Sequence, residues 1–260
     1  MRFLLLLIPL LFFISGFSQQ KNERLEAILQ QSKTSWKQYQ SDHFKFFVEE
    51  NLYADQQIDS VKNKLETERS YIIRFLEHNS FTDTANIIIV DTREKIKNLL
   101  GFEVQGFAIP ENNMVVFLYS KDYSLAARHE LTHYYLFHTW GRPAHNWFSE
   151  GLAVYNDQKW SGYQVDSLCK HLKDNSKLLK MATLSKKFHA LNAMIAYPQI
   201  GSFTGFLLSA YGKPKVKALW TRGFGEIKAI YGKSLKELEK EWLQHLDSMQ
   251  PNTIDYSRHL

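Results

Sequence analysis

The apolar residues in the first half of the chain recur with two different periods, which predicts helices alternating with strands. Residues 22–40 and 54–78 each carry apolar side chains on one helical face, so we expect two amphipathic helices there. Residues 43–49 partly alternate and residues 86–91 form a short β-branched run, so both segments predict strands. A short helix ending at Leu100 is expected after the second strand.

A β-hairpin is expected between this short helix and the second half of the chain. Val104–Ile109 and Met114–Tyr119 are largely apolar, and the residues between them, Pro110-Glu-Asn-Asn113, favour a turn. Beyond about residue 120 nearly every apolar pattern has the helical period. The expected helices cover 124–140, 147–157, 164–180, 199–211, 214–223 and 235–248.

These elements together predict an α+β fold, and no linker separates its two halves. We expect a single domain over residues 19–260. A sheet-containing lobe, about 19–140, holds a small mixed β-sheet and the helix at 124–140, and a mainly helical lobe covers about 141–260. A cleft between two such lobes is a common place for a ligand to bind.

The first residues predict export from the cytoplasm. Met1-Arg2 supplies a positive charge, residues 3–14 are mostly apolar, and small residues precede a cleavage position after Ser18. The apolar run is shorter than the roughly 20 residues that a spanning helix needs, which favours a cleaved signal peptide at 1–18 over an uncleaved membrane anchor. We therefore expect a mature chain that begins at Gln19, is secreted or periplasmic, and has no stable membrane span.

Composition and charge narrow the class of function. The 260 residues carry a formal net charge of +5, and the basic residues are scattered among acidic ones, so nothing favours a nucleic-acid partner. A hydrophobic content of 44% is typical of a packed globular protein. The single cysteine, Cys169, excludes an intramolecular disulfide and is expected to be a small buried side chain.

The most informative string is His129-Glu-Leu-Thr-His133, which lies in the helix expected at 124–140. Residues four apart lie on one helical face, so both imidazoles can converge on one metal ion. Glu130 is offset by one position, where its carboxylate can take a proton from water beside that ion. Two zinc-binding histidines with a general-base glutamate are a known pattern of metalloproteases.

A third ligand is available in Glu150, at the start of the next expected helix. Gly141 and Pro143 end the first helix and reverse the chain, so an antiparallel pair of helices brings Glu150 back beside the histidines. Small residues at Gly151 and Ala153 would let these two helices approach closely. Two histidines with one glutamate are an established ligand set of catalytic zinc, so the sequence predicts Zn²⁺ as the cofactor.

Other histidine arrangements fit less well. The metzincin pattern requires a glycine and a histidine three and six places after the second histidine, where this chain has Leu136 and Thr139. His138 is rotated off the face that carries the motif, and His145 lies in the expected turn. We interpret these two as a surface residue and a loop residue, not as metal ligands.

The motif, together with the following string Pro143-Ala-His-Asn-Trp-Phe-Ser-Glu-Gly-Leu-Ala-Val-Tyr155, resembles the peptidase MA-like gluzincin family. The similarity covers roughly residues 44–246, and the metal motif is its specific part. The resemblance implies a zincin-like fold, an active-site helix and zinc-dependent peptide hydrolysis. It implies the general base at Glu130 and the zinc ligands at His129, His133 and Glu150.

One position departs from that family's pattern. Thermolysin-like members have an aspartate four residues after the ligand glutamate, which orients a zinc-binding histidine, and here that position is Val154. Asp157 or a backbone carbonyl is expected to take over this role. The resemblance also implies a downstream tyrosine that stabilises the oxyanion; Tyr197 is the candidate, with Tyr155 as the alternative.

The predicted function is therefore that of a secreted zinc-dependent metallopeptidase, which hydrolyses peptide bonds with metal-activated water. The strand at Val104–Ile109 is expected to pair with an extended peptide or protein substrate through Gly106 and Ala108. Two alternatives are a catalytically inactive relative that binds peptides in the cell envelope and a zinc hydrolase of a non-peptide amide. The complete set of ligands and base favours the peptidase over the inactive relative.

Overall fold

The computed structural model describes residues 23, 25–30, 36–78, 81–82, 84–250 and 254. These residues form two compact units: unit 1 comes from Met1–Tyr71 and Asn79–Ala127, and unit 2 from Ile72–His78 and Arg128–Leu260. The α+β class is confirmed, because a mixed sheet lies in unit 1 and unit 2 is largely helical. The signal peptide predicted at 1–18 lies outside the described residues, and the single-domain interpretation stays a prediction.

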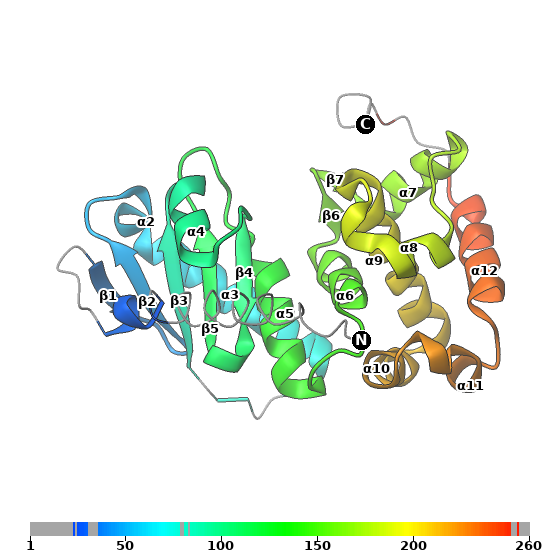
Figure 1. Cartoon of the computed structure of the whole chain (residues 1–260), viewed down its shortest axis with the longest axis horizontal. Helices are drawn as coiled ribbons and strands as arrows, with labels where there is room; N and C mark the ends of the chain where they lie inside the picture. The colour runs from blue at the N-terminus through cyan, green and yellow to red at the C-terminus, as the bar shows by residue number, and fades with distance from the viewer. Residues whose placement is uncertain are drawn as a thin grey trace, which may run out of the picture. The chain divides into compact units, whose positions relative to one another are not determined.

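Unit 1 is built on a five-stranded sheet with the strand order β1-β2-β3-β5-β4 (Figure 1). The central strand, β3, is parallel to β2 and β5, whereas β1 and β4 are antiparallel edge strands. The predicted strands and hairpin of this region are therefore confirmed. The strands are β1 Trp36–Gln40, β2 Phe44–Glu49, β3 Ala85–Val90, β4 Gly106–Ile109 and β5 Met114–Leu118.

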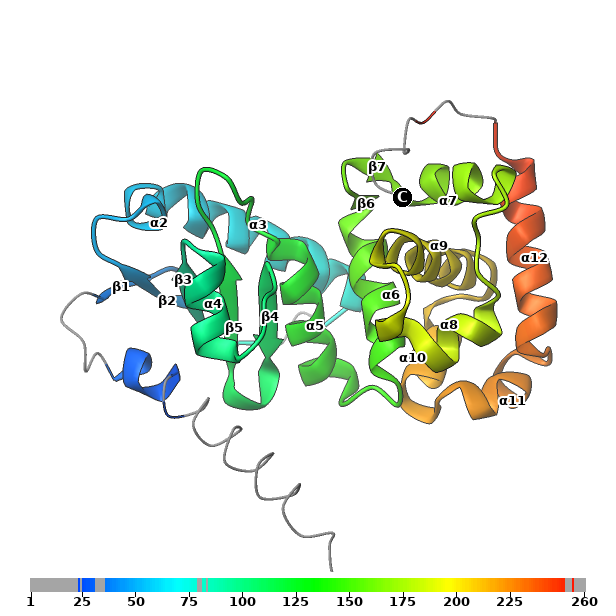
Figure 2. The ribbon, with the colours of Figure 1, turned by 45° about the horizontal axis from the view of Figure 1, so that its top comes forward.

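Helices cover both faces of this sheet (Figures 1 and 2). α4 (Arg93–Leu100) and residues 25–30 pack on one face, and α3 (Ile58–Leu76), which follows α2 (Tyr53–Gln56), passes along the other. Because β3 and β5 are covered on both faces, they are nearly continuous apolar runs and not alternating ones. The cluster under α4 comprises Leu25, Ile28, Phe47, Ile88, Val90, Ile96, Leu100, Ile109, Met114, Val116 and Leu118.

The helix predicted over residues 22–40 is wrong in its second half. Among the described residues of this segment, 23 and 25–29 are helical, whereas Trp36–Gln40 form β1. This strand pairs antiparallel with β2, so that Trp36 lies opposite Glu49. Aromatic residues favour strands, and pairing with a neighbouring strand outweighs a helical pattern that few residues support.

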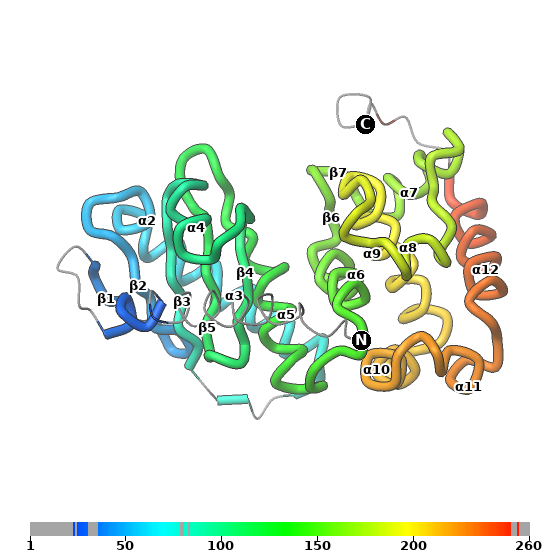
Figure 3. Tube along the Cα trace, viewed as in Figure 1, coloured from blue at the N-terminus to red at the C-terminus, as the bar shows by residue number. Residues whose placement is uncertain are grey.

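Among the described residues, unit 2 contains one short hairpin and eight helices, the first of which, α5, begins one residue before the unit does. Figure 3 traces the chain through these elements. The helices predicted at 124–140, 147–157, 214–223 and 235–248 are confirmed to within three residues by α5, α6, α10 and α12. α7 is shorter than predicted, and α8, α11 and the hairpin β6–β7 were not predicted. No helix of the described residues is long and apolar enough to cross a membrane. The bounds are α5 Ala127–Trp140, α6 Asn146–Asp157, β6 Lys159–Trp160, β7 Tyr163–Gln164, α7 Val165–Asp174, α8 Met181–Lys187, α9 Ala193–Tyr211, α10 Lys213–Arg222, α11 Ile227–Tyr231 and α12 Leu235–Ser248.

α9 begins at Ala193, whereas the sequence predicted that this helix begins at residue 199, directly after Pro198. The side-chain oxygen of Asn192 caps the helix by accepting a hydrogen bond from the backbone N–H of Met194 at 2.9 Å. The helix accommodates Pro198 in its interior. As a result Tyr197 is a helical residue and not part of a preceding loop.

The packing of α6 against α9 depends on glycine. A Cβ on Gly151 would lie 2.4 Å from Thr204 Oγ1, and a Cβ on Gly201 would lie 2.4 Å from a methyl carbon of Val154. We predicted that Gly151 lets α6 approach α5 closely, and this prediction is wrong. The atoms that a side chain at position 151 would meet belong to α9. This close contact fixes α9 against the helix that carries Glu150.

Candidate metal centre

α5 presents His129 and His133 on one face, as their four-residue spacing predicts. The centroids of the two imidazole rings lie 5.0 Å apart. Residues 128–140, which the sequence analysis assigned to the sheet-containing lobe, belong to unit 2. Both histidines therefore share one compact unit with Glu150.

The turn between α5 and α6 is tied to α10. Gly141, with a φ of +81°, ends α5 in the left-handed region, and its N–H donates to the carbonyl of Phe137 at 2.9 Å. The indole N–H of Trp220 donates to the Gly141 carbonyl at 2.9 Å, and the N–H of Ala144 donates to the Trp220 carbonyl at 2.8 Å. These bonds reverse the chain, so that α6 starts beside α5 with Glu150 near its beginning.

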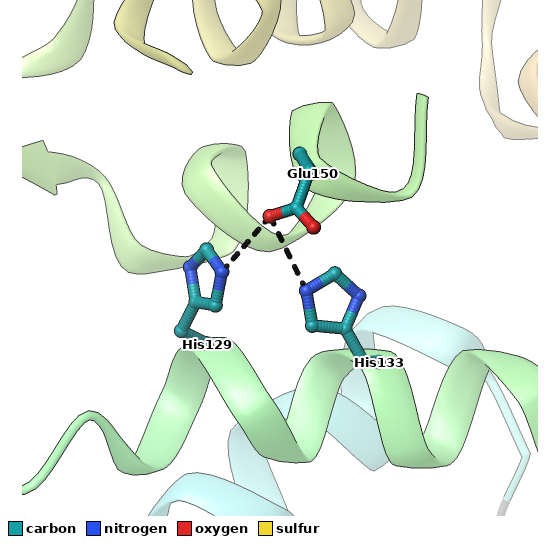
Figure 4. A group of neighbouring side chains, drawn as sticks. All are labelled: His129, His133 and Glu150. Carbon is teal, nitrogen blue, oxygen red and sulfur yellow. Dashed lines mark hydrogen bonds and ion pairs between the residues drawn. The ribbon is translucent and has the colours of Figure 1, made fainter. Parts of the chain in front are cut away.

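The three predicted ligands converge (Figure 4). Glu150 Oε2 lies 3.2 Å from His129 Nε2 and 3.5 Å from His133 Nε2. Each side chain offers one donor atom to a group whose members all lie within 4.8 Å of one another, and the described residues contain no other group of this kind. Two imidazole nitrogens and one carboxylate oxygen are a donor set of catalytic zinc, so these residues fit a zinc ion.

The second nitrogen of each imidazole is held by a polar side chain of α6. His129 Nδ1 lies 3.1 Å from Asp157 Oδ2, and His133 Nδ1 lies 2.7 Å from Ser149 Oγ. These contacts leave both Nε2 atoms facing Glu150, and they orient the rings as outer partners of metal-binding histidines do. Of the two partners proposed for this role, Asp157 is the one found. Ser149 was missed, although it directly precedes the ligand glutamate.

We expect Asp157→Asn to weaken zinc binding by about 10- to 100-fold, because it removes the negative charge that orients His129 and raises its basicity. Competition with a chromophoric chelator measures this affinity. Asp42→Asn, the same chemical change at an exposed residue of unit 1, serves as the matched control. An Asp157→Asn variant with wild-type zinc affinity would contradict the assigned role.

Charges around the centre favour a cation. Burial alone would lower the pKa of His129, but hydrogen bonds with Asp157 and Glu150 raise that pKa well above its usual value. Burial opposes the charge of Glu150 as well, yet the positive charge of His133 and hydrogen bonds from both histidines hold the Glu150 pKa below its usual value. The carboxylates thus stabilise positive charge between them, which is what a bound metal ion requires.

Glu130 lies on α5 between the two histidines but is not one of the three converging donors. Its side chain is buried, and burial is the main cause that raises its pKa above the usual value. The neighbouring imidazoles oppose this shift, and the carboxylates of Glu150 and Asp157 add to it. A carboxylate whose pKa is shifted upwards holds a proton more readily than an exposed one, which suits a group that accepts a proton and then returns it.

Tyr197 lies on α9 and is half-buried. Its ring stacks on Trp160, with centroids 4.8 Å apart and planes 15° from parallel. Burial raises the pKa of Tyr197 to about 12, and the negative charges of Glu150 and Glu130 contribute to the shift. The phenol therefore stays protonated at neutral pH, as a hydrogen-bond donor within electrostatic reach of both carboxylates.

The alternative tyrosine, Tyr155, has a packing role. Its ring lies 6.0 Å from that of Phe75 between centroids, and a Cβ on Gly205 would lie 2.9 Å from its Cδ2 atom. Tyr155 thus fills space against α9 and the end of α3. The arrangement of unit 2 favours Tyr197 over Tyr155 as the predicted oxyanion donor, and that role stays a prediction.

The two residues predicted to bind substrate, Gly106 and Ala108, lie on the edge strand β4 of unit 1. The carbonyl of Gln105 accepts a hydrogen bond from the N–H of Leu118 at 2.8 Å. Bonded and non-bonded residue pairs alternate in an antiparallel ladder, so the backbone groups of Gly106 and Ala108 face the side of β4 away from β5. The role of Gly106 and Ala108 in substrate binding stays a prediction.

The remaining donor side chains stay outside the converging group. The ring of His138 packs 4.6 Å from that of Tyr134, and the ring of the exposed His145 lies 6.4 Å from that of Trp147 and 6.0 Å from that of Phe224. Cys169 is fully buried, as predicted, and burial raises the pKa of its thiol. These residues are part of the packing of unit 2.

No protein-family model matches the chain, and neither does any curated protein. Among solved structures, the chain is similar to an aminopeptidase N family protein from Idiomarina loihiensis. The two are 15% identical in sequence, with a TM-score of 0.36. The match covers 86% of this chain and 45% of that protein, so the chain spans about half the length of its match. At this level of similarity the function has to be inferred from the chain's own residues.

Proposed function

We propose that this chain is a zinc-dependent metallopeptidase. The observation that carries the proposal is the convergence of His129, His133 and Glu150, with a separate buried carboxylate, Glu130, on the same helix. A structural metal site is usually closed by a fourth protein ligand, whereas the described residues supply three donors here. Three ligands and a nearby proton acceptor are the arrangement of a hydrolytic centre.

In the proposed mechanism the protein's own groups move the proton and hold the developing charge. Zinc, when bound, polarises the scissile carbonyl and lowers the pKa of a water molecule. Glu130 takes a proton from the attacking water and passes it to the leaving amine nitrogen. The Tyr197 phenol donates a hydrogen bond to the oxyanion that forms when the carbonyl carbon becomes tetrahedral.

Substrate binding is proposed to use the strand β4 (Gly106–Ile109). An extended peptide would pair there with the backbone groups of Gly106 and Ala108 and add a strand to the sheet of unit 1. Peptides methylated at a single backbone nitrogen test this pairing, because that nitrogen no longer donates a hydrogen bond. Equal cleavage of every methylated and unmethylated peptide would argue against strand addition.

Export is proposed from the sequence of residues 1–18, which lie outside the described part of the chain. The mature protein would be secreted or periplasmic and would begin at Gln19. Mass spectrometry of the N-terminal peptide tests this directly. An intact Met1 on the exported protein would favour the uncleaved anchor.

Digestion of a broad peptide library tests the proposed function. We expect the zinc-loaded chain to cleave peptides, cleavage to stop when a chelator removes the metal, and activity to return when zinc is restored. A chain that binds peptides and zinc without cleaving them would support the inactive binding protein instead. Cleavage of non-peptide amides alone would support the second alternative.

A further inference from the structure

Two aromatic rings contact Tyr197 and restrict the orientation of its own ring. The indole of Trp160 stacks on it at 4.8 Å between centroids and 15° between planes. The ring of Phe188 contacts it at the same centroid distance with an angle of 50°. Aromatic contacts of this geometry are favourable beyond the burial of apolar area, so they favour one side-chain orientation over others.

Trp160 is anchored independently of Tyr197. It is the last residue of β6, opposite Tyr163 of β7, and two residues with positive φ, Ser161 at 50° and Gly162 at 87°, close this hairpin. A two-residue turn with both residues in the left-handed region matches the twist of paired strands. Trp160 also packs against the buried cluster of Leu168 and Leu172 in α7, against which Met194 and Ile195 of the first turn of α9 pack as well.

The position of Tyr197 relative to the metal centre follows from the packing of α6 and α9. A Cβ on Gly151, the residue after Glu150, would lie 2.8 Å from Ile200 Cγ1. Tyr197 lies three residues before Ile200 and so shares a face of α9 with it. This contact brings the face of α9 that carries Tyr197 against the turn of α6 that carries Glu150.

The segment from α6 to the hairpin β6–β7 therefore supplies three residues of the metal centre. Ser149 and Asp157 hold the two imidazoles, and Glu150 is the carboxylate ligand. Trp160 follows Asp157 closely in sequence and contacts the one tyrosine that the centre is proposed to use. The same segment thus carries both the residues of the metal centre and the indole ring of Trp160, which stacks on Tyr197.

We propose that Trp160 is a positioning residue, which sets the direction of the Tyr197 hydroxyl through the stacked rings and thereby acts on the transition state without touching the substrate. This inference rests on the proposed function of Tyr197 as oxyanion donor. The contribution comes from the ring face, since Trp160 Nε1 is buried and has no hydrogen-bond partner among the described residues. Phenylalanine can therefore replace tryptophan in this role, whereas leucine, which fills part of the space without a ring, cannot.

The first test measures the position of the ring and needs no activity. 3-Fluorotyrosine placed at position 197 gives a single ¹⁹F resonance, which the ring current of a stacked indole shifts. We expect Trp160→Leu to move this resonance towards the value of unfolded chain, and Trp160→Phe to move it less. A resonance unchanged in folded Trp160→Leu protein would overturn the proposal, and melting temperatures establish that both variants fold.

The second test is a double-mutant cycle with peptide substrate. We expect Tyr197→Phe to lower kcat by roughly 10²-fold, the loss typical of one oxyanion donor, and Trp160→Leu to lower it by about 10-fold with zinc content and KM unchanged. Trp160→Phe should restore most of the loss. Added to Tyr197→Phe, Trp160→Leu should have no further effect, because it acts through the hydroxyl that is already gone.

Independent, multiplying effects of the two substitutions would overturn the positioning role, as would a Trp160→Leu variant that loses zinc or changes KM alone. A wild-type chain that cleaves no peptide would instead overturn the proposed function. In that case the fluorine measurement still decides whether Trp160 fixes the ring of Tyr197.

Discussion

Replacing Glu130 with glutamine should abolish most peptide hydrolysis and leave the zinc in place. The substitution keeps the shape and volume of the side chain, but an amide cannot accept the proton of the attacking water. Glu130 is buried and lies outside the three converging donors, so its loss should not weaken metal binding. We expect kcat to fall by at least about 10²-fold, the low end for a positioned acid–base group. Steady-state kinetics with a cleaved library peptide and elemental analysis of the same sample measure both effects.

The control for this substitution is Glu226→Gln, the same change at an exposed residue of unit 2. It should retain wild-type activity and zinc. Two outcomes would contradict the role of Glu130. Near-normal cleavage by Glu130→Gln would mean that another group transfers the proton, and loss of zinc would mean that this carboxylate is a ligand.

Replacing His133 with alanine should remove both zinc binding and activity. Its Nε2 atom is one of the three donors, and the loss cannot be compensated because the described residues offer no further donor in the group. Removing an outer partner of a ligand costs about 10- to 100-fold in metal affinity, so removal of a ligand itself should weaken zinc binding by more than about 100-fold. Competition with a chelator of known affinity measures this change.

His138→Ala provides the matched control on the same helix. His138 is excluded from the donor group, and its ring packs against Tyr134, so the variant should bind zinc like the wild type once its folding is verified by circular dichroism. Wild-type zinc affinity in His133→Ala, or loss of zinc in His138→Ala alone, would show that the ligand set is misassigned.

The predicted ligands could be located from the sequence because the signals that place them are local. The spacing of His129 and His133 fixes them on one helical face, and Gly141 marks the end of that helix. The position of Glu150 then follows from a short turn, which the structure bears out with a donor group within 4.8 Å. Each step depends on neighbouring residues and not on distant contacts.

The partners of the histidines were harder to predict, because they depend on distances between side chains and not on spacing. Asp157 was one of two candidates, and the choice between it and a backbone carbonyl needed the 3.1 Å contact with His129. Ser149 gives no signal beyond its place before Glu150. The role of Gly151 was assigned to the wrong neighbour, because the sequence does not reveal which helix packs on that side.

Two β-elements were missed for different reasons. β1 was predicted as helix because its strand character comes from pairing with β2, a tertiary contact. The hairpin β6–β7 did leave a signal, since Ser161-Gly162 is a turn dipeptide flanked by the aromatic residues Trp160 and Tyr163. Each strand has only two residues, so the helical pattern of the residues on either side outweighed this signal.

The central claim is that His129, His133 and Glu150 hold one zinc ion, and metal analysis of the purified wild-type chain tests it most directly. The protein is purified without chelators or affinity metals, equilibrated with zinc, freed of excess ion and analysed for metal and protein together. The account predicts one zinc per chain, lost in His133→Ala and retained in Glu130→Gln. A wild-type chain that is folded and holds no stoichiometric zinc would contradict it.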